Sequence, residues 1–114
     1  MELNIAERIA LIGVLPQQGN AVTLRVIREL QTQLSFTDEE IEHYGIENHL
    51  LPDGRASINW NPELIDETKD IEIGKTAKKA IIAQLERLDK TGQLHISMMP
   101  IYDRFIEPES EEDN

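Results

Sequence analysis

Apolar residues in this chain recur at two different spacings, and this pattern constrains the fold more than any other feature. Four segments place them three or four residues apart, as on one face of a helix: residues 4–15, 21–34, 76–90 and 97–106. Residues 46–51 and 56–60 instead alternate in the manner of strands. The sequence therefore predicts an α+β fold with N-terminal helices, a small antiparallel sheet and two C-terminal helices.

Residues at the ends of these segments predict where the helices begin and end. Asn4 and Glu7 have the spacing of a capping box at the start of the first helix, and Thr37 and Glu40 have the same spacing before a short third helix that Gly45 can end. The core face of the first helix is expected to consist of Ile5, Ile9, Ile12 and Leu15.

The middle of the chain is expected to form the sheet. The turn sequence PDGR lies between residues 46–51 and 56–60, which predicts a β-hairpin. Residues 70–73, with the sequence DIEI, supply a third short strand. The sheet is therefore predicted to contain two or three strands.

Composition and charge define the domain and the kind of surface it presents. The chain has 114 residues, 39% of them hydrophobic and 4% aromatic, and no cysteine, which excludes a disulfide framework and a thiol nucleophile. The formal charge is −11, and five acidic residues lie among the last eight. We expect one domain over residues 1–106, itself acidic at −6, followed by a disordered acidic tail over residues 107–114.

Motifs for catalysis or cofactor binding are missing from the sequence. Gly74-Lys75-Thr76 resembles the end of a phosphate-binding loop, but that loop needs a glycine where this chain has Lys69. Glu39 and His43 have the i, i+4 spacing of half a metal site, without a second pair. We therefore predict no catalytic, cofactor-binding or metal-binding residue, and a function other than that of an enzyme.

Three helices followed by a hairpin also match the element order of a winged-helix DNA-binding domain. In that case residues 37–45 would enter the major groove, but they carry four acidic residues and no Lys or Arg. Phosphates would repel such a segment. Nucleic-acid binding is therefore the alternative hypothesis, and a nucleic-acid partner is not expected.

Large apolar residues near the C-terminus and after the hairpin are the candidate protein interface, because Trp, Tyr and Met are common in interface cores. The competing hypothesis is that they fill the core of the monomer. We expect a protein partner, with self-association as an alternative. No apolar run approaches the roughly 20 residues of a membrane span, so we expect no membrane contact and a cytoplasmic location. The candidate interface residues are Trp60, Met98, Met99, Ile101, Tyr102 and Phe105.

Two longer stretches, residues 15–40 and 71–94, resemble a group of small uncharacterised proteins of tailed bacteriophages and prophages. The similarity rests on Leu15-Pro16 before Gly19-Asn20, on the junction LSFT at residues 34–37, and on the helix that ends near Gly92. It implies a phage-encoded protein that acts inside a bacterial host. The negative charge, the small size and the lack of a catalytic motif favour an accessory factor that modulates a host or phage protein, and an inhibitor that mimics nucleic acid is one form of it. A virion or assembly component is a further alternative. The resemblance assigns no functional residue.

Overall fold

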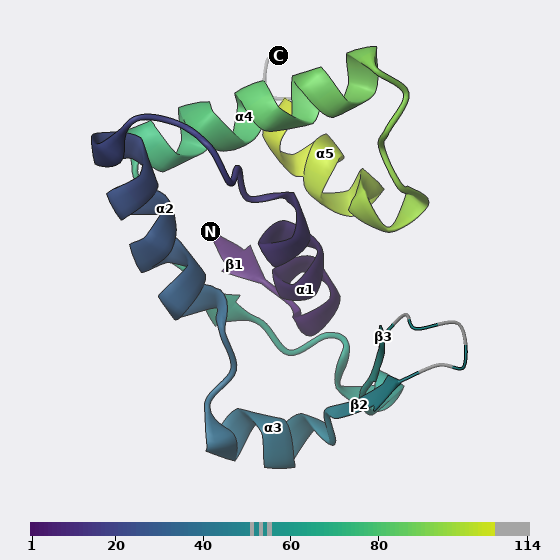
Figure 1. Cartoon of the computed structure of the whole chain (residues 1–114). Helices are drawn as coiled ribbons and strands as arrows, with labels where there is room; N and C mark the ends of the chain where they lie inside the picture. The colour runs from purple at the N-terminus through teal and green to yellow at the C-terminus, as the bar shows by residue number, and fades with distance from the viewer. Residues whose placement is uncertain (51, 53, 55, 107–114) are drawn as a thin grey trace, which may run out of the picture.

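A computed structural model describes residues 1–50, 52, 54 and 56–106 (Figure 1). The predicted α+β class is confirmed. The predicted disordered tail and two residues of the hairpin turn lie outside the described residues. The elements are β1 (Glu2–Leu3), α1 (Ile5–Val14), α2 (Ala21–Leu34), α3 (Asp38–Tyr44), β2 (Glu47–Leu50), β3 (Ala56–Asn59), the 3-10 helix η1 (Pro62–Leu64), β4 (Lys69–Asp70), α4 (Lys75–Lys90), the 3-10 helix η2 (Ile96–Met98) and α5 (Met99–Ile106).

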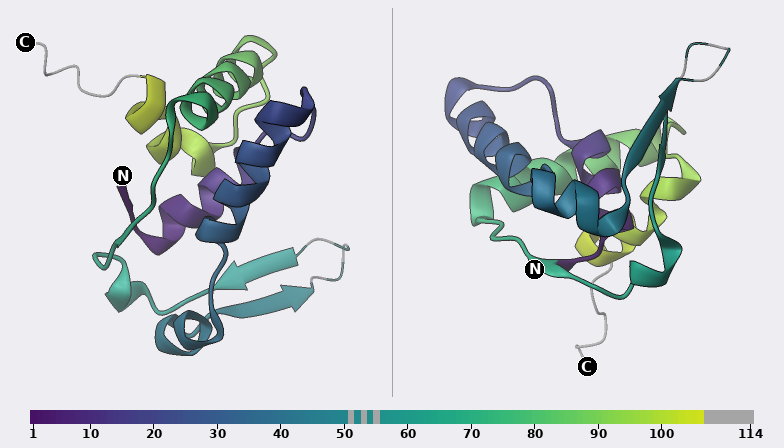
Figure 2. Two further views of the ribbon diagram at one scale, coloured as in Figure 1. Left: turned by 90° about the vertical axis from the view of Figure 1, so that its left-hand side faces the viewer. Right: turned by 90° about the horizontal axis from the view of Figure 1, so that it is seen from below.

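The chain forms two unequal parts. Helices α1, α2, α4 and α5 pack together, and α3 lies with the β2–β3 hairpin at one end of this group (Figures 1 and 2). We call residues 1–35 and 69–106 the helical body and residues 36–68 the lobe. The core lies inside the helical body, and its largest fully buried apolar side chains include Leu3, Leu11, Leu34, Ile71, Ile81, Leu85 and Ile101.

Both predicted capping boxes are present, and they determine where α1 and α3 begin. The Asn4 side chain accepts a hydrogen bond from the Glu7 backbone at 2.8 Å, and the Glu7 carboxylate accepts one from the Asn4 backbone at 2.9 Å. Thr37 and Glu40 form the same reciprocal pair before α3. Gly45 ends α3 in the left-handed conformation with φ 66°, as expected.

The described residues form two separate two-stranded sheets. The strand predicted over residues 70–73 is present only at Asp70, because β4 ends there, and it does not join the hairpin. Strands β2 and β3 pair with each other, whereas β4 pairs with β1 near the N-terminus. The ammonium group of Met1 strengthens this second pairing by donating to the Asp70 carboxylate at 3.0 Å and to the Ile71 carbonyl at 2.9 Å. A two-residue strand carries no alternating pattern, so the sequence could not indicate β1.

Helix α1 is rotated relative to the predicted core face. Leu11 and Val14 are fully buried, and Ile5 and Leu15 are buried as expected. Ile9 and Ile12 were predicted to share this face, but they are only half-buried. The reason is that α1 is apolar over most of its circumference, so the spacing alone does not identify which apolar face meets the core.

Helix α5 contributes to the core rather than to a free surface. Ile101 and Phe105 are 0% and 3% exposed, which excludes both from contact with a partner. Met98 and Tyr102 are half-buried and pack against the same core. In the described part of the chain, no helix has the length and the apolar character needed to cross a membrane.

Replacing Ile101 by alanine tests this placement. The Ile101→Ala variant should lower the free energy of unfolding by about 2–5 kcal/mol, because it removes buried methyl groups and leaves a cavity. Ile96→Ala makes the same chemical change at a residue that is 80% exposed, and should cost less than about 0.5 kcal/mol. Urea denaturation of both variants measures the difference. Equal losses would contradict the burial of Ile101.

Candidate functional site

A mostly apolar cleft separates α1 from the lobe. Its volume is about 360 Å³, and α1 forms one wall while α3 and the hairpin form the other. Ser35 and Phe36 close one end, where the chain passes from α2 into α3. Among the lining residues only Ser35 and Asn48 have polar side chains. The cleft is lined by Ile9, Ile12, Gly13, Ser35, Phe36, Ile41, Ile46, Asn48 and Ile58.

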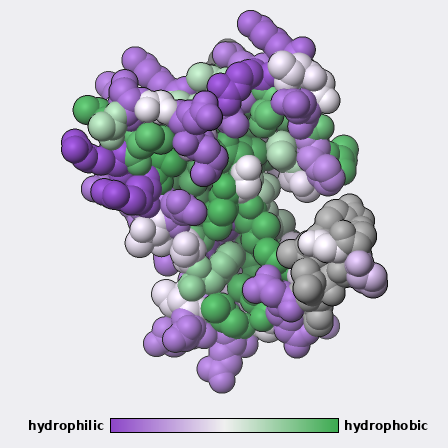
Figure 3. All heavy atoms as spheres, in the orientation of Figure 1, coloured by the Kyte–Doolittle hydropathy of each residue, from purple (hydrophilic) through white to green (hydrophobic). Residues whose placement is uncertain are grey.

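A second cleft continues on the other side of Ile9 and Gly13, which line both. It has a volume of about 380 Å³ and lies between α1 on one side and η2 with the first turn of α5 on the other. Because the two clefts share the lining residues Ile9 and Gly13, they lie next to each other along α1, and we call them together the α1 groove. Figure 3 shows hydrophobic surface in the middle of this face, between more hydrophilic regions. The second cleft is lined by Ala6, Ile9, Ala10, Gly13, Trp60, Ile96, Ser97, Met98 and Pro100.

Exposed aliphatic side chains concentrate in the α1 groove. Ile41, Ile58 and Ile96 are 41%, 40% and 80% exposed, and all three line it. Val22 is the other large apolar residue that is exposed in the described part of the chain, and it lies on α2 away from the groove. Single exposed apolar residues are ordinary, but a group of them along a concave track is typical of a binding surface.

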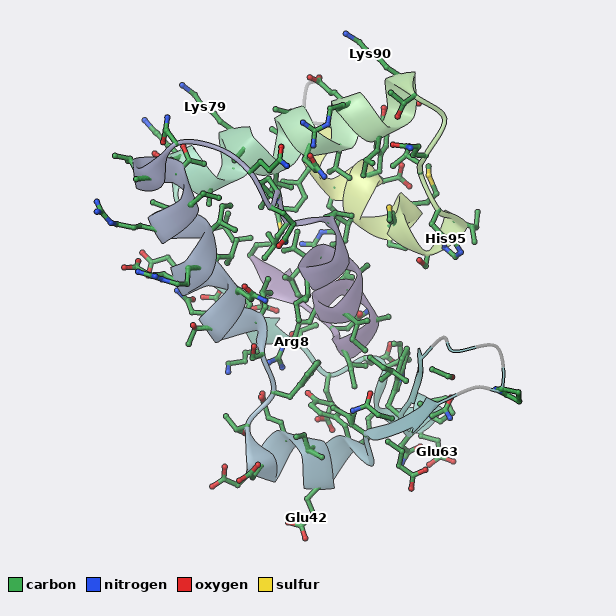
Figure 4. The ribbon with its side chains drawn as sticks, viewed as in Figure 1. Arg8, Glu42, Glu63, Lys79, Lys90 and His95 are labelled. Atoms are coloured by element: carbon green, nitrogen blue, oxygen red, sulfur yellow. The ribbon has the colours of Figure 1, made fainter. Side chains whose placement is uncertain are left out.

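A buried arginine fixes the lobe to the helical body and so sets the shape of the groove. Arg8 is 1% exposed, and its guanidinium donates to the backbone carbonyls of Leu34 and Ser35 at distances of 3.1 and 2.9 Å. It also donates to both carboxylate oxygens of Glu40, at 3.0 and 3.2 Å. The guanidinium carbon lies 4.1 Å from the centre of the Phe36 ring. One side chain of α1 therefore contacts the end of α2, the junction and α3 (Figure 4).

The ion pair changes the titration of Glu40. Hydrogen bonds from Arg8 are the main cause that lowers the pKa of Glu40 from its usual 4.5 to about 2, although partial burial acts in the opposite direction. Lys69, whose ammonium nitrogen lies 3.6 Å from a Glu40 oxygen, adds a smaller contribution. Glu40 is therefore ionised at neutral pH and compensates the buried charge of Arg8.

Charge is distributed unevenly between the two parts. The lobe carries nine acidic and one basic residue, a formal charge of −8, whereas the helical body carries eight acidic and ten basic residues, a formal charge of +2. In the lobe, the acidic side chains of the described residues are exposed, apart from half-buried Glu40. Glu42 and Glu63 point away from the lobe, while Lys79 and Lys90 extend from α4 at the opposite end of the molecule (Figure 4).

Within the lobe, aromatic and polar contacts hold α3 in place. Tyr44 is buried, with its ring centre 6.4 Å from that of Phe36, and His43 lies 2.8 Å from a carboxylate oxygen of Glu67. Burial raises the pKa of Tyr44, and the nearby Glu67 carboxylate raises it further. These contacts hold α3 in position, and with it Ile41, which lines the α1 groove.

The structure separates the six predicted interface residues into three pairs. Ile101 and Phe105 are in the core, as described above. Met98 and Trp60 line the second cleft of the α1 groove. Met99 and Tyr102 are half-buried outside it, and the Tyr102 hydroxyl donates to the Asp89 carboxylate at 3.2 Å.

The remaining sequence features show no site for a metal or a phosphate. Across the described ranges, no three His, Asp or Glu residues come together in a way that could hold a metal ion. Gly74 is the N-cap residue of α4 and lines a third cleft of about 320 Å³ between α2 and α4. Glu29 and Glu72 also line this cleft, and their carboxylates would repel a phosphate.

Sequence reasoning missed two residues that define the groove. Arg8 is the one charged residue among the buried residues of α1, three positions from both Ile5 and Leu11. This spacing was the signal in the sequence that could have indicated a buried arginine. Gly13 gave only a weak signal, because a glycine in the last turn of a helix usually marks its end.

Comparison with known proteins gave no match to any protein-family model, curated protein or solved structure.

The Arg8–Glu40 pair predicts an acid-sensitive contribution to stability. Because the pKa of Glu40 is lowered on folding, the pair stabilises the fold above about pH 5, and this contribution of about 3 kcal/mol is lost as the pH falls from about 4.5 towards 2. Glu40→Gln should therefore unfold more easily at pH 7 and show a flatter stability profile over that range. Denaturant titrations at several pH values measure this.

Glu39→Gln is the matched control for this prediction, since Glu39 neighbours Glu40 in α3 and is exposed. It should retain the wild-type loss of stability between pH 5 and 2. If Glu40→Gln and the wild type lost stability in parallel over this range, the coupling between Arg8 and Glu40 would be disproved.

Proposed function

We propose that this protein is a non-enzymatic binding module that takes up an apolar segment of a partner protein in the α1 groove. The observation that carries the proposal is the grouping of exposed Ile41, Ile58 and Ile96 along one concave track. Burying these side chains against a partner would contribute about 25 cal/mol for each Å² of apolar surface removed from water.

The form of the groove supports the proposal. A Cβ atom added at Gly13 would meet no atom within 4 Å, so the space above α1 is open at the point where the two clefts join. Ala6 and Ala10 line the second cleft, and their small side chains leave the α1 backbone close to the surface of the groove. A partner can therefore approach the α1 backbone closely while the isoleucines contact its flanks.

The sequence resemblance suggests where such a module acts. We place it, as part of the proposal, among phage-encoded accessory proteins that modulate a host or phage protein in the bacterial cytoplasm. A virion or assembly component would use the same groove towards a phage protein, and the identity of the captured partner distinguishes the two settings. An inhibitor that mimics nucleic acid would instead use the charge of the lobe.

Filling the groove from within is the sharpest test. Gly13→Leu places a side chain in the open space and should weaken partner binding by about tenfold or more, since the partner loses that volume. The variant should be as stable as the wild type or more so, because glycine inside a helix costs roughly 0.5–1 kcal/mol relative to alanine. Pull-down from nuclease-treated bacterial lysate, quantified by mass spectrometry, compares the two proteins.

Ala83→Leu is the control, because it adds a leucine to an exposed position of α4 outside the groove. It should bind the same partner as the wild type does. Undiminished capture by Gly13→Leu, with a normal thermal melt, would show that the partner binds elsewhere.

The winged-helix alternative leads to a different expectation. Helix α3 has exposed acidic residues at Asp38, Glu39 and Glu42 and lies in a lobe of charge −8, so we expect no DNA binding. An electrophoretic mobility-shift titration of random-sequence duplex DNA at low salt measures this. A shift at micromolar protein would favour the DNA-binding alternative over the proposed function.

A further inference from the structure

The occupant of the α1 groove must satisfy its own backbone hydrogen bonds. The floor is helix α1, whose backbone groups are already paired within the helix, apart from those at its ends. An extended peptide lying across this apolar floor would bury unpaired N–H and C=O groups, which is costly. A helix has no such cost, and it can present residues at i, i+3, i+4 and i+7 to the groove.

The acidic lobe determines the charge of that helix. Ile41, Ile46 and Ile58 come from the lobe, so a partner that contacts them lies directly against the part of the molecule that carries −8. The opposite wall belongs to the helical body. There, in the described part of the chain, cations without an ion pair lie on α2 and α4, outside the groove lining: Arg25, Arg28, Lys75, Lys78, Lys79, Arg87 and Lys90.

We infer that the α1 groove binds a basic amphipathic helix of a partner protein. The apolar stripe of that helix packs on Ile9 and Gly13 of α1, and Lys or Arg residues beside the stripe face the acidic lobe. This inference rests on the proposed function and adds the class of partner. Complementary charge accelerates association and makes it sensitive to salt.

Three designed peptides test the inference without knowledge of the natural partner. All three have the same helical apolar face. The remaining positions are all Lys in the first peptide, all Gln in the second and all Glu in the third. Fluorescence anisotropy with labelled peptides should give an affinity for the Lys peptide about tenfold higher than for the Gln peptide at low salt. The difference should shrink at about 0.5 M salt, and the Glu peptide should bind most weakly.

Two triple variants with the same net charge locate the effect. Asp38→Asn, Glu39→Gln and Glu42→Gln together neutralise α3 and should reduce the preference for Lys over Gln about threefold or more. Glu29→Gln, Glu86→Gln and Asp103→Asn remove the same number of charges from the helical body. This control should keep the preference within about twofold of the wild-type value.

The possible outcomes separate this inference from the proposed function. Equal binding of the Lys and Gln peptides, with both abolished by Gly13→Leu, would overturn the basic partner but retain the groove. Absence of binding by all three peptides would also overturn the inference, and the proposed function would then stand only if Gly13→Leu still prevented capture of the lysate partner.

Self-association is the remaining outcome. If sedimentation showed a wild-type dimer that Gly13→Leu converts to a monomer, the occupant would be a second copy of this chain, and the inference of a basic helix would be wrong.

Discussion

The contacts of Arg8 are the interaction on which the arrangement of this protein depends. A guanidinium that is 1% exposed needs compensation for its charge and its hydrogen-bond donors, and here Glu40 and two backbone carbonyls provide it. Those partners lie at the end of α2 and in α3. Satisfying one buried side chain therefore fixes the position of the lobe against α1, and with it the separation of the two groove walls.

The same contact compensates one of the negative charges of the lobe, and solvent weakens the repulsion among the others. Glu40 pairs with Arg8 and Lys69 of the helical body, so its charge is used within the fold. The other described acidic side chains of the lobe are in water, where repulsion between them is weakened by solvent and salt. The field of the lobe is thus available to a partner beside the groove, while the net charge of +2 on the body keeps the two ends electrostatically distinct.

Local signals in the sequence predicted the helices well, because capping boxes and turn residues act over three or four positions. The caps at Asn4 and Thr37 and the left-handed Gly45 are examples. Contacts between distant residues were not predictable in this way. The β1–β4 pair joins residues 2 and 70, and the choice between Ile9 and Leu11 as the core residue of α1 depends on where α2, α4 and α5 pack.

The groove itself shows why apolar residues must be judged by their grouping rather than by their number. Val22 is 64% exposed and isolated on α2, which is normal for a protein surface. Ile41, Ile58 and Ile96 come from three segments and meet at one track only after folding. The open space at Gly13 keeps that track accessible, since any larger side chain there would fill it from α1. An apolar surface kept open beside a strongly acidic lobe is therefore the feature that best connects this fold to binding.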